Sequence, residues 1–281
     1  MDFLEIPIGD GVNRVVDWMI VNLAPVFDGV RRMIGTLLNW TEDMLLAVPW
    51  PVLIAVIVAA VWRSAGWKAA LMSAVGMYVI GGMELWERAM GTLALMITSV
   101  ALSVAVGVPL GILCAYSNRV HAVVRPLLDI MQTMPAFVYL VPALMFFGIG
   151  KVPAVFATIV FASPPAVRLT HLGIRQVPRE VIEATESFGA TTWQQLLKVQ
   201  LPLARESIMT GVNQTIMLSL SMSVLAAMIA AGGLGQEVLR GLSQVDLGRA
   251  FEAGLAIVVI AMIMDRVSST LDDKRQASHS S

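Results

Sequence analysis

The polar segment from Glu183 to Pro202 organises the rest of the chain, and it reads Glu-Ala-Thr-Glu-Ser-Phe-Gly-Ala-Thr-Thr-Trp-Gln-Gln-Leu-Leu-Lys-Val-Gln-Leu-Pro. It stands between long apolar windows that carry no charge. Just before it, Pro178 suits a first helical position, and Gly189 can adopt the left-handed conformation found just past a helix end. The pattern therefore predicts a helix over 178–188 followed by a sharp turn.

A second short helix is predicted after the turn. Thr192, with Gln195 three residues later, forms a capping-box pattern, in which side chains and backbone at a helix start bond each other. Pro202 has no backbone N–H, so this helix should end before it. We expect a helix, a turn and a helix that lie across one face of a membrane.

The composition of the chain indicates a membrane protein. Hydrophobic residues make up 57% and charged residues 14%, whereas about a quarter of the residues in ordinary soluble domains are charged. The net charge of -1 gives no support for nucleic-acid binding. Because Cys114 is the single cysteine, an internal disulfide is excluded.

Seven charge-free windows follow one another along the chain: 45–61, 69–83, 90–117, 130–149, 152–167, 208–234 and 253–264. A transmembrane helix needs about 20 mostly apolar residues, so the shorter windows must include flanking residues. The windows predict an all-α polytopic membrane protein with about seven transmembrane helices. An odd number of crossings places the two termini on opposite sides.

The N-terminal region differs from the windows that follow it. Apolar residues recur at helical spacing over 12–38, charged residues occupy the other faces, and Pro25 should kink or split the helix. We interpret residues 1–43 as an amphipathic, interfacial region; a helix packed on the edge of the bundle is the alternative. Residues 44–268 then form the transmembrane domain with the loop 172–205, and 269–281 form a short cytoplasmic tail.

The distribution of lysine and arginine predicts the orientation, because cytoplasmic loops carry the excess. Twelve lie on one side, namely Arg63, Lys68, Arg119, Arg125, Arg168, Arg175, Arg179, Lys198, Arg205, Arg266, Lys274 and Arg275. Seven lie on the other, namely Arg14, Arg31, Arg32, Arg88, Lys151, Arg240 and Arg249. The loop around Glu183 and the C-terminus should therefore be cytoplasmic, and the N-terminus periplasmic.

Small residues and prolines mark special points inside the windows. Gly107 and Gly111 form a small-xxx-small pair that lets helices approach closely. Prolines are expected to interrupt the fourth window at Pro135 and Pro142 and the end of the fifth at Pro164 and Pro165. Because broken helices are tolerated where they line protein or a cavity, we expect the translocation path near the fourth to sixth spans. The stretch 232–235 should form an outer loop or a re-entrant turn.

The polar segment resembles the cytoplasmic signature of the membrane subunits of bacterial ABC importers. That signature reads Glu-Ala-Ala, three residues, Gly, nine residues, Ile, one residue and Leu-Pro. This chain has Glu183-Ala184-Thr185, Gly189, Val199 and Leu201-Pro202 at that spacing. Thr185 and Val199 are the two departures, and both keep the size of the family residue.

The flanks are similar to the permeases for glycine betaine, proline betaine and choline. The matching stretches are 128–142 (LDIMQTMPAFVYLVP), 211–215 (GVNQT), and 232–236 (GGLGQ) through 239–241. The resemblance implies a bacterial inner-membrane permease that imports these osmoprotectants by alternating access. It further implies a permease homodimer, two separate ATP-binding cassette subunits and a periplasmic substrate-binding protein.

The resemblance also assigns roles to residues. The helix and turn that dock into the ATPase contain Glu183, Ala184, Thr185 and Gly189, and the anchor to the next span is Leu201 with Pro202. No catalytic residue, metal or cofactor is implied in this chain, because the partner subunit binds ATP. A quaternary ammonium group is attracted to aromatic faces, and the candidate substrate path comprises Met134, Phe137, Tyr139 and Asn213.

Other functions find less support in the sequence. Importers for amino acids, including methionine, share the signature, but the stretch 131–142 argues against them. An ion channel would show a filter or a charged pore ring, and an intramembrane enzyme would need paired catalytic groups. The histidines His121, His171 and His279 have no metal-ligand spacing and are interpreted as solvated or interfacial loop residues.

Overall fold

The computed structural model describes residues 8–229 and 231–273, and every regular element in these ranges is helical. The elements are α1 Ile8–Asn22, α2 Ala24–Ala47, α3 Trp50–Gly82, α4 Trp86–Tyr116, α5 Asn118–Thr133, η1 Ala136–Tyr139, α6 Leu140–Phe147, α7 Lys151–Arg175, α8 Arg179–Ser187, α9 Thr192–Gln195, η2 Leu196–Gln200, α10 Leu201–Leu203, α11 Arg205–Leu225, η3 Ala226–Ile229, α12 Gly233–Gln244 and α13 Leu247–Asp273. The all-α prediction is confirmed. The end of the tail, 274–281, with Lys274, Arg275 and His279, lies outside the described residues.

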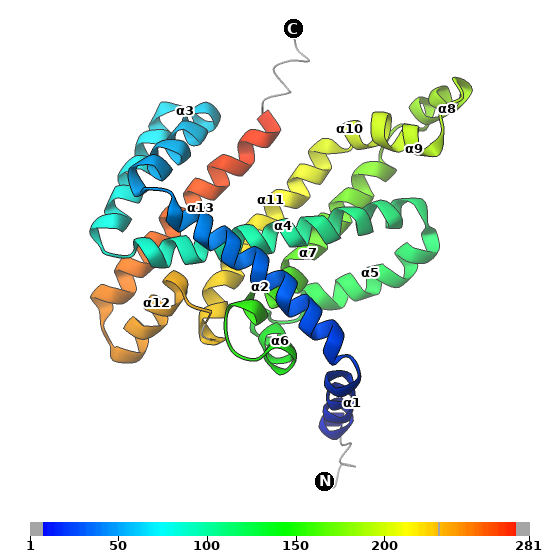
Figure 1. Cartoon of the computed structure of the whole chain (residues 1–281). Coiled ribbons are helices and arrows are strands. Elements are labelled where there is room, and N and C mark those ends of the chain that lie inside the picture. The colour runs from blue at the N-terminus through cyan, green and yellow to red at the C-terminus, as the bar shows by residue number, and fades with distance from the viewer. Residues whose placement is uncertain (1–7, 230, 274–281) are drawn as a thin grey trace, which may run out of the picture.

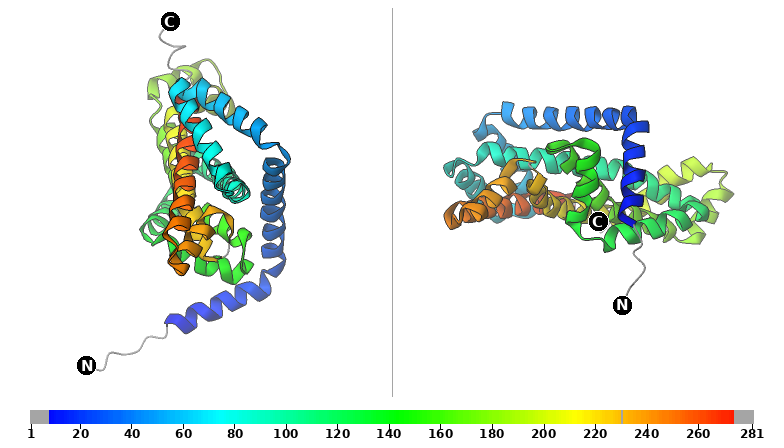
Figure 2. Two further views of the ribbon diagram at one scale, coloured as in Figure 1. Left: turned by 90° about the vertical axis from the view of Figure 1, so that its left-hand side faces the viewer. Right: turned by 90° about the horizontal axis from the view of Figure 1, so that it is seen from below.

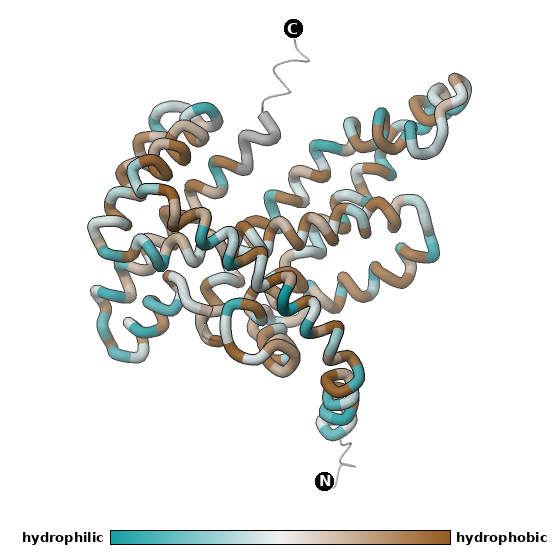
Figure 3. The backbone as a smooth tube through the Cα atoms, viewed as in Figure 1, coloured by the Kyte–Doolittle hydropathy of each residue, from teal (hydrophilic) through white to brown (hydrophobic). Residues whose placement is uncertain are grey.

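The long apolar helices match the predicted windows in part. In the described ranges, four helices are long and apolar enough to cross a membrane, or up to six if each of two bent pairs is one span. Window 69–83 falls in the second arm of α3, after a kink at Gly66 with φ 83° and ψ 176°. Figure 3 shows hydrophobic residues along the long helices and a more hydrophilic α12.

The centre of the molecule is the packing of α7 against α4 and α11, where glycines allow the backbones to meet. A Cβ at Gly107 would lie 2.8 Å from Cβ of Ala166, and one at Gly111 would lie 2.7 Å from the Val167 carbonyl oxygen. A Cβ at Gly211 would lie 3.0 Å from the Pro165 carbonyl oxygen. Close approach of this kind holds helices together in lipid, and the prediction for Gly107 and Gly111 is confirmed.

The predicted break at Pro164 and Pro165 is wrong, because α7 is continuous from Lys151 to Arg175 with both prolines buried inside it. A proline removes one backbone hydrogen bond and strains its own helix. Here close neighbours on two sides, α4 and α11, hold the helix in place. Tertiary packing therefore overrides the local signal.

The fourth window does bend, at one of the two predicted positions. Helix α5 ends at Thr133, Pro135 has an extended backbone, and the segment Ala136–Phe147 turns by 113° from α5. Pro142 does not interrupt helix α6, because it lies in the first turn, where the backbone N–H groups have no partner within the helix. The kink is therefore confirmed at Pro135 and is wrong at Pro142.

The sixth window is shorter than predicted and ends in a turn. Helix α11 and the short η3 stop at Ile229, and Gly232 and Gly233 both have positive φ. A Cβ at Gly233 would lie 2.4 Å from Oγ1 of Thr92, so the turn presses against α4. Leu234 is already part of α12, and its backbone N–H donates to Oγ1 of Thr92 at 2.8 Å.

The N-terminal region divides at Pro25, as predicted, into α1 and α2. Most of α1 is exposed, whereas Ile34 and Leu38 of α2 are each 1% exposed within the main core. The ring of Phe27 stacks on Phe146 of α6 with centroids 4.6 Å apart. The second half of this region is thus packed on the bundle (Figure 2).

The two ends of the molecule carry different parts of the chain. Figures 1 and 2 place α8 and the last described turns of α13 toward one end, and α1 toward the opposite end. Helices α12 and α6 lie toward the same end of the molecule as α1 (Figure 1).

Candidate ATPase-coupling site

The polar segment forms the predicted helix, turn and helix at one corner of the molecule (Figure 1). Helix α8 spans Arg179–Ser187 with Pro178 as its N-cap residue, so it is one residue shorter at each end than predicted. Gly189 follows with φ +76°, the left-handed conformation expected of it. A left-handed residue here reverses the chain toward α9.

The second helix starts one residue earlier than predicted, so the cap at Thr192 with Gln195 is wrong. The capping box is formed by Thr191 and Gln194: the Gln194 N–H donates to Oγ1 of Thr191 at 3.3 Å, and the Thr191 N–H donates to Oε1 of Gln194 at 2.9 Å. The repeats Thr191-Thr192 and Gln194-Gln195 fit both registers. The tertiary structure selects one because Gln195 is engaged elsewhere.

Gln195 joins the two short helices. Its side chain is buried, and Nε2 donates to the Ile182 carbonyl oxygen at 3.3 Å and to Oγ1 of Thr185 at 3.2 Å. Thr185 is the position where the signature normally has alanine. Its hydroxyl therefore gives this chain a polar link between α8 and α9 that an alanine could not form.

The helix after the turn continues past Pro202, in contrast to the prediction. The backbone widens to a π-turn over Leu196–Gln200, in which the Leu201 N–H bonds to the Leu196 carbonyl oxygen, and α10 then includes Pro202. Widened turns of this kind accommodate local irregularity within a helix. The helical run is interrupted only at Ala204, just before α11.

An apolar contact and a polar contact anchor the segment to the bundle. Leu196 and Ala204 are buried together with Ile174 of α7, and Leu201 packs against them. The hydroxyl of Tyr116, the last residue of α4, donates to Oε1 of Gln200. The segment is thus attached to the ends of both α4 and α7.

Helix α8 itself stands away from the bundle and exposes the signature residues. A cavity of about 420 Å³, lined by Tyr116, Arg175, Glu183 and Gln200 among others, lies between α8 and the ends of α4 and α7. Glu183 and Ala184 are exposed, and Glu183 forms an exposed ion pair with Arg179 at 3.2 Å. Such a pair contributes little to stability, so Glu183 is available to a partner.

Two aromatic residues on this corner were not predicted from the sequence. Phe188 is 91% exposed at the end of α8, and Trp193 in α9 is also exposed. Large apolar side chains left in water within a polar segment often mark interaction sites. Their position in an otherwise polar island was the available signal.

The four candidate substrate-path residues come from two parts of the chain. Met134, Phe137 and Tyr139 lie at the bend between α5 and α6, whereas Asn213 lies on α11. Phe137 is exposed, and Tyr139 is buried with its hydroxyl donating to the Met131 carbonyl oxygen. At this bend Tyr139 serves packing and hydrogen bonding.

The interpretation of His121 and His171 as loop residues is wrong. They lie on α5 and α7, and their rings stack with centroids 4.1 Å apart and an interplanar angle of 13°. Within the described part of the chain, no group of three or more metal-ligating side chains is close enough to hold an ion.

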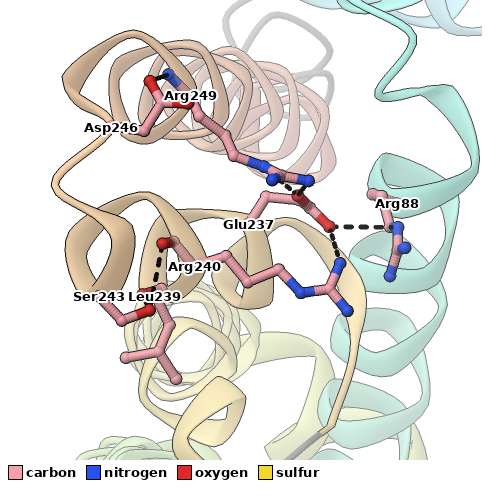
Figure 4. Close-up of polar contacts among 7 residues, drawn as sticks. All are labelled: Arg88, Glu237, Leu239, Arg240, Ser243, Asp246 and Arg249. Atoms are coloured by element: carbon pink, nitrogen blue, oxygen red, sulfur yellow. Dashed lines mark hydrogen bonds and ion pairs between the residues drawn. The ribbon is translucent and has the colours of Figure 1, made fainter.

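A buried carboxylate at the opposite end of the molecule was also missed (Figure 4). Glu237 of α12 has a side chain only 4% exposed, and it contacts Arg240 at 2.8 Å, Arg249 of α13 at 2.8 Å and Arg88 of α4 at 3.5 Å. The guanidinium groups compensate the buried charge. This cluster joins α12 to α4 and α13.

Apolar helices long enough to cross a membrane and a protruding polar helix pair define a membrane protein with an exposed polar segment at one corner. The chain belongs to the family described as binding-protein-dependent transport system inner membrane component, whose model matches residues 107–276. It is therefore a multi-pass inner-membrane protein.

Curated relatives agree with this assignment. The chain is 50% identical to the glycine betaine/proline betaine transport system permease protein ProW of Escherichia coli (strain K12), over 95% of this chain and 75% of the relative. It is 45% identical to the glycine betaine transport system permease protein OpuAB of Bacillus subtilis (strain 168), over 97% of each. The glycine betaine/carnitine transport permease protein GbuB of Listeria monocytogenes is 43% identical, over 97% of this chain and 98% of the relative.

A solved structure shares the fold. A chain of the MetNI methionine ABC transporter in an inward-facing conformation matches with a TM-score of 0.59 and 23% identity, over 69% of this chain and 95% of that chain. At this identity the likeness concerns the fold alone.

Proposed function

We propose that this chain is the permease of an ATP-driven importer for quaternary ammonium osmoprotectants, with glycine betaine, proline betaine, choline and carnitine as the substrate class. The observation that carries the proposal is the identity of 45% over 97% of both chains with a glycine betaine permease. The coupling segment on α8 to α10 supports it. ATP is bound and hydrolysed by a separate subunit.

The proposed assembly is a homodimer of this chain with two ATP-binding cassette subunits and a periplasmic binding protein. Seven crossings are proposed, with the second arm of α3 as the seventh. The N-terminus is periplasmic and the C-terminus cytoplasmic. The split of twelve and seven basic residues supports this orientation, as does the placement of α8 and the end of α13 at one end of the molecule (Figure 1).

The coupling mechanism follows from how α8 is held. Helix α8 docks into the ATPase through the exposed Glu183, Ala184 and Phe188. Leu196, Leu201 and Gln200 attach the segment to the ends of α4 and α7. Because α7 leads directly into α8 and α10 into α11, a displacement of the docked helix reaches the central helices. The substrate path at the α5–α6 bend and Asn213 remains part of the proposal.

An importer for another small solute, such as an amino acid, is the second candidate, since the structural neighbour is a methionine transporter. One experiment separates the two. Cells that express this chain with its ATPase and its binding protein are given labelled glycine betaine, choline or methionine, each with the unlabelled others as competitors.

We expect ATP-dependent uptake of a quaternary amine that methionine does not inhibit. Uptake of methionine alone would overturn the substrate class and leave the importer assignment intact. Loss of all uptake from a fully assembled complex would remove the proposed cargo.

A further inference from the structure

Two polar stripes face each other across the contact between α5 and α7, and the function proposed above does not use them. On α5 the stripe is His121, Arg125 and Asp129, four residues apart; on α7 it is Arg168, His171 and Arg175, three and four apart. These spacings place each set on one face of its helix. Two residues of the α5 stripe, Asp129 and His121, each contact a residue of the α7 stripe.

Three side-chain contacts join α5 to α7, one at each end of the stripes and one between them. Arg168 donates to Asp129 at 2.6 Å, and Arg175 donates to the side-chain oxygen of Asn118. Between them the imidazoles of His121 and His171 stack at 4.1 Å. Arg125 lies between His121 and Asp129, and in the described part of the chain it forms no ion pair.

The stripes border an open groove with an unbalanced charge, and Arg125 and Asp129 are exposed in it. It has a volume of about 300 Å³ and is lined by Cys114, His121, Arg125, Asp129, Arg168 and His171, among others. Two guanidinium charges face one carboxylate, so one positive charge is uncompensated even with neutral imidazoles. Each neutral imidazole still offers one N–H donor.

Apolar exposed side chains lie beside the cavity. Leu172 of α7, which lines the cavity, is exposed, and on the outer face of α5, away from the stripe, Val123 is 71% and Leu127 59% exposed. In a membrane protein such side chains are covered by lipid. A ligand that fits both parts has an anionic group and hydrocarbon chains.

The depth of the cavity matches the headgroup region. Cys114 lies two residues before the end of α4, and His171 lies one turn before the end of α7. Both helices are long enough to span a membrane, and α8 follows α7 directly. The cavity is therefore at the level of lipid phosphates, on the side of the coupling segment.

We propose that the cavity between α5 and α7 binds the phosphate of an anionic phospholipid through Arg125, with His121, His171 and Arg168 as further donors. A phosphodiester carries one negative charge, which matches the single uncompensated cation, and arginine binds phosphate oxygens strongly. The bound lipid joins α5 to the last turns of α7, just before the coupling helix.

The test measures lipid retention by the whole complex. The permease with its ATPase is reconstituted in nanodiscs of phosphatidylcholine with a quarter phosphatidylglycerol, extracted in mild detergent, and examined by native mass spectrometry. Arg125→Gln removes the unpaired cation, whereas Arg119→Gln, on the same helix and exposed, is the matched control. We expect retained phosphatidylglycerol to fall about tenfold in Arg125→Gln and to stay unchanged in Arg119→Gln.

A second variant, His121→Gln, and a competition with inorganic phosphate complete the test. His121→Gln keeps a polar side chain, and we expect it to lower retention severalfold with an unchanged melting temperature of the complex. Equal retention in Arg125→Gln and Arg119→Gln overturns the proposal. Displacement of the lipid by millimolar inorganic phosphate, with equal phosphate binding in pure phosphatidylcholine discs, assigns the site to free phosphate and also overturns it. Loss of the permease dimer in Arg125→Gln with unchanged retention assigns this face to a second copy of the chain.

Discussion

At the residue scale, single positions in the coupling segment carry distinct physical roles. Gly189 is required by its backbone, since φ is +76° and a Cβ there would meet nothing within 4 Å. Ala184 is an exposed helical residue with no such conformational demand. Thr185 and Gln195 hold α8 against α9 by hydrogen bonds. A substitution at each position therefore tests a different property.

The first prediction separates bulk from backbone strain at Gly189. We expect Gly189→Arg to insert and assemble its helices but to lose uptake, because a long cation obstructs the ATPase contact. A non-glycine residue at positive φ costs about 1–2 kcal/mol, and asparagine tolerates this conformation best. Gly189→Asn is therefore the control for strain, and it should keep most of the uptake.

Uptake and co-purification of the ATPase are measured together for both variants. Normal transport by a well-expressed Gly189→Arg protein would contradict the docking role of this turn. Equal loss in both variants would assign the effect to the backbone.

At the element scale, the packing of α4 on α7 is set by glycines whose neighbours differ. A Cβ at Gly111 would lie 2.7 Å from both the Val167 carbonyl oxygen and Cβ of Thr170, whereas one at Gly254 of α13 would meet nothing within 4 Å. Both glycines lie inside helices. Alanine substitutions at the two glycines therefore compare a position where the helix backbones are in close contact with one where they are not.

The second prediction uses this pair. We expect Gly111→Ala to destabilise the protein by about 1–3 kcal/mol, because the backbones must separate. Gly254→Ala should be neutral or stabilising by up to about 1 kcal/mol, since alanine favours helix. Thermal unfolding of the detergent-solubilised permease measures both, and a lower melting temperature for Gly254→Ala than for Gly111→Ala would refute the packing account.

At the scale of the whole molecule, the N-terminal region joins parts that are distant in sequence. Helix α2 buries Ile34 and Leu38 in the main core. Glu42 also accepts from the Lys151 ammonium group, at 2.6 Å to Oε1, so α2 is bound to the start of α7. Helix α1 makes few buried contacts. We therefore expect the protein to tolerate deletion of α1 but not deletion of α2.

The third prediction compares two truncations. Deletion of residues 1–22 removes α1, and we expect normal assembly and uptake. Deletion of 1–39 also removes Ile34 and Leu38, each worth about 2–5 kcal/mol when truncated to alanine, and should abolish stable expression. Membrane yield, complex size and uptake are the measurements. Full function of the longer deletion would show that α2 is dispensable to the core.

Much of the architecture follows from the sequence by local rules. The charge-free windows, the signature around Glu183, the left-handed Gly189 and the split at Pro25 depend on residues near one another in the chain. Small residues at Gly107 and Gly111 also indicate close packing before the partner helix is known. These signals determine an all-helical membrane protein with a polar helix-turn-helix segment, because lipid and backbone geometry act on each segment separately.

Only the tertiary structure decided the features that depend on contacts between segments far apart in the sequence. Neighbouring helices keep α7 continuous through Pro164 and Pro165, and the use of Gln195 by α8 moves the cap of α9 to Thr191. The stacking of His121 on His171 joins helices fifty residues apart in the sequence. Glu237 likewise meets Arg88 and Arg249 from other helices. Such contacts depend on which helix faces join, and no local pattern contains that information.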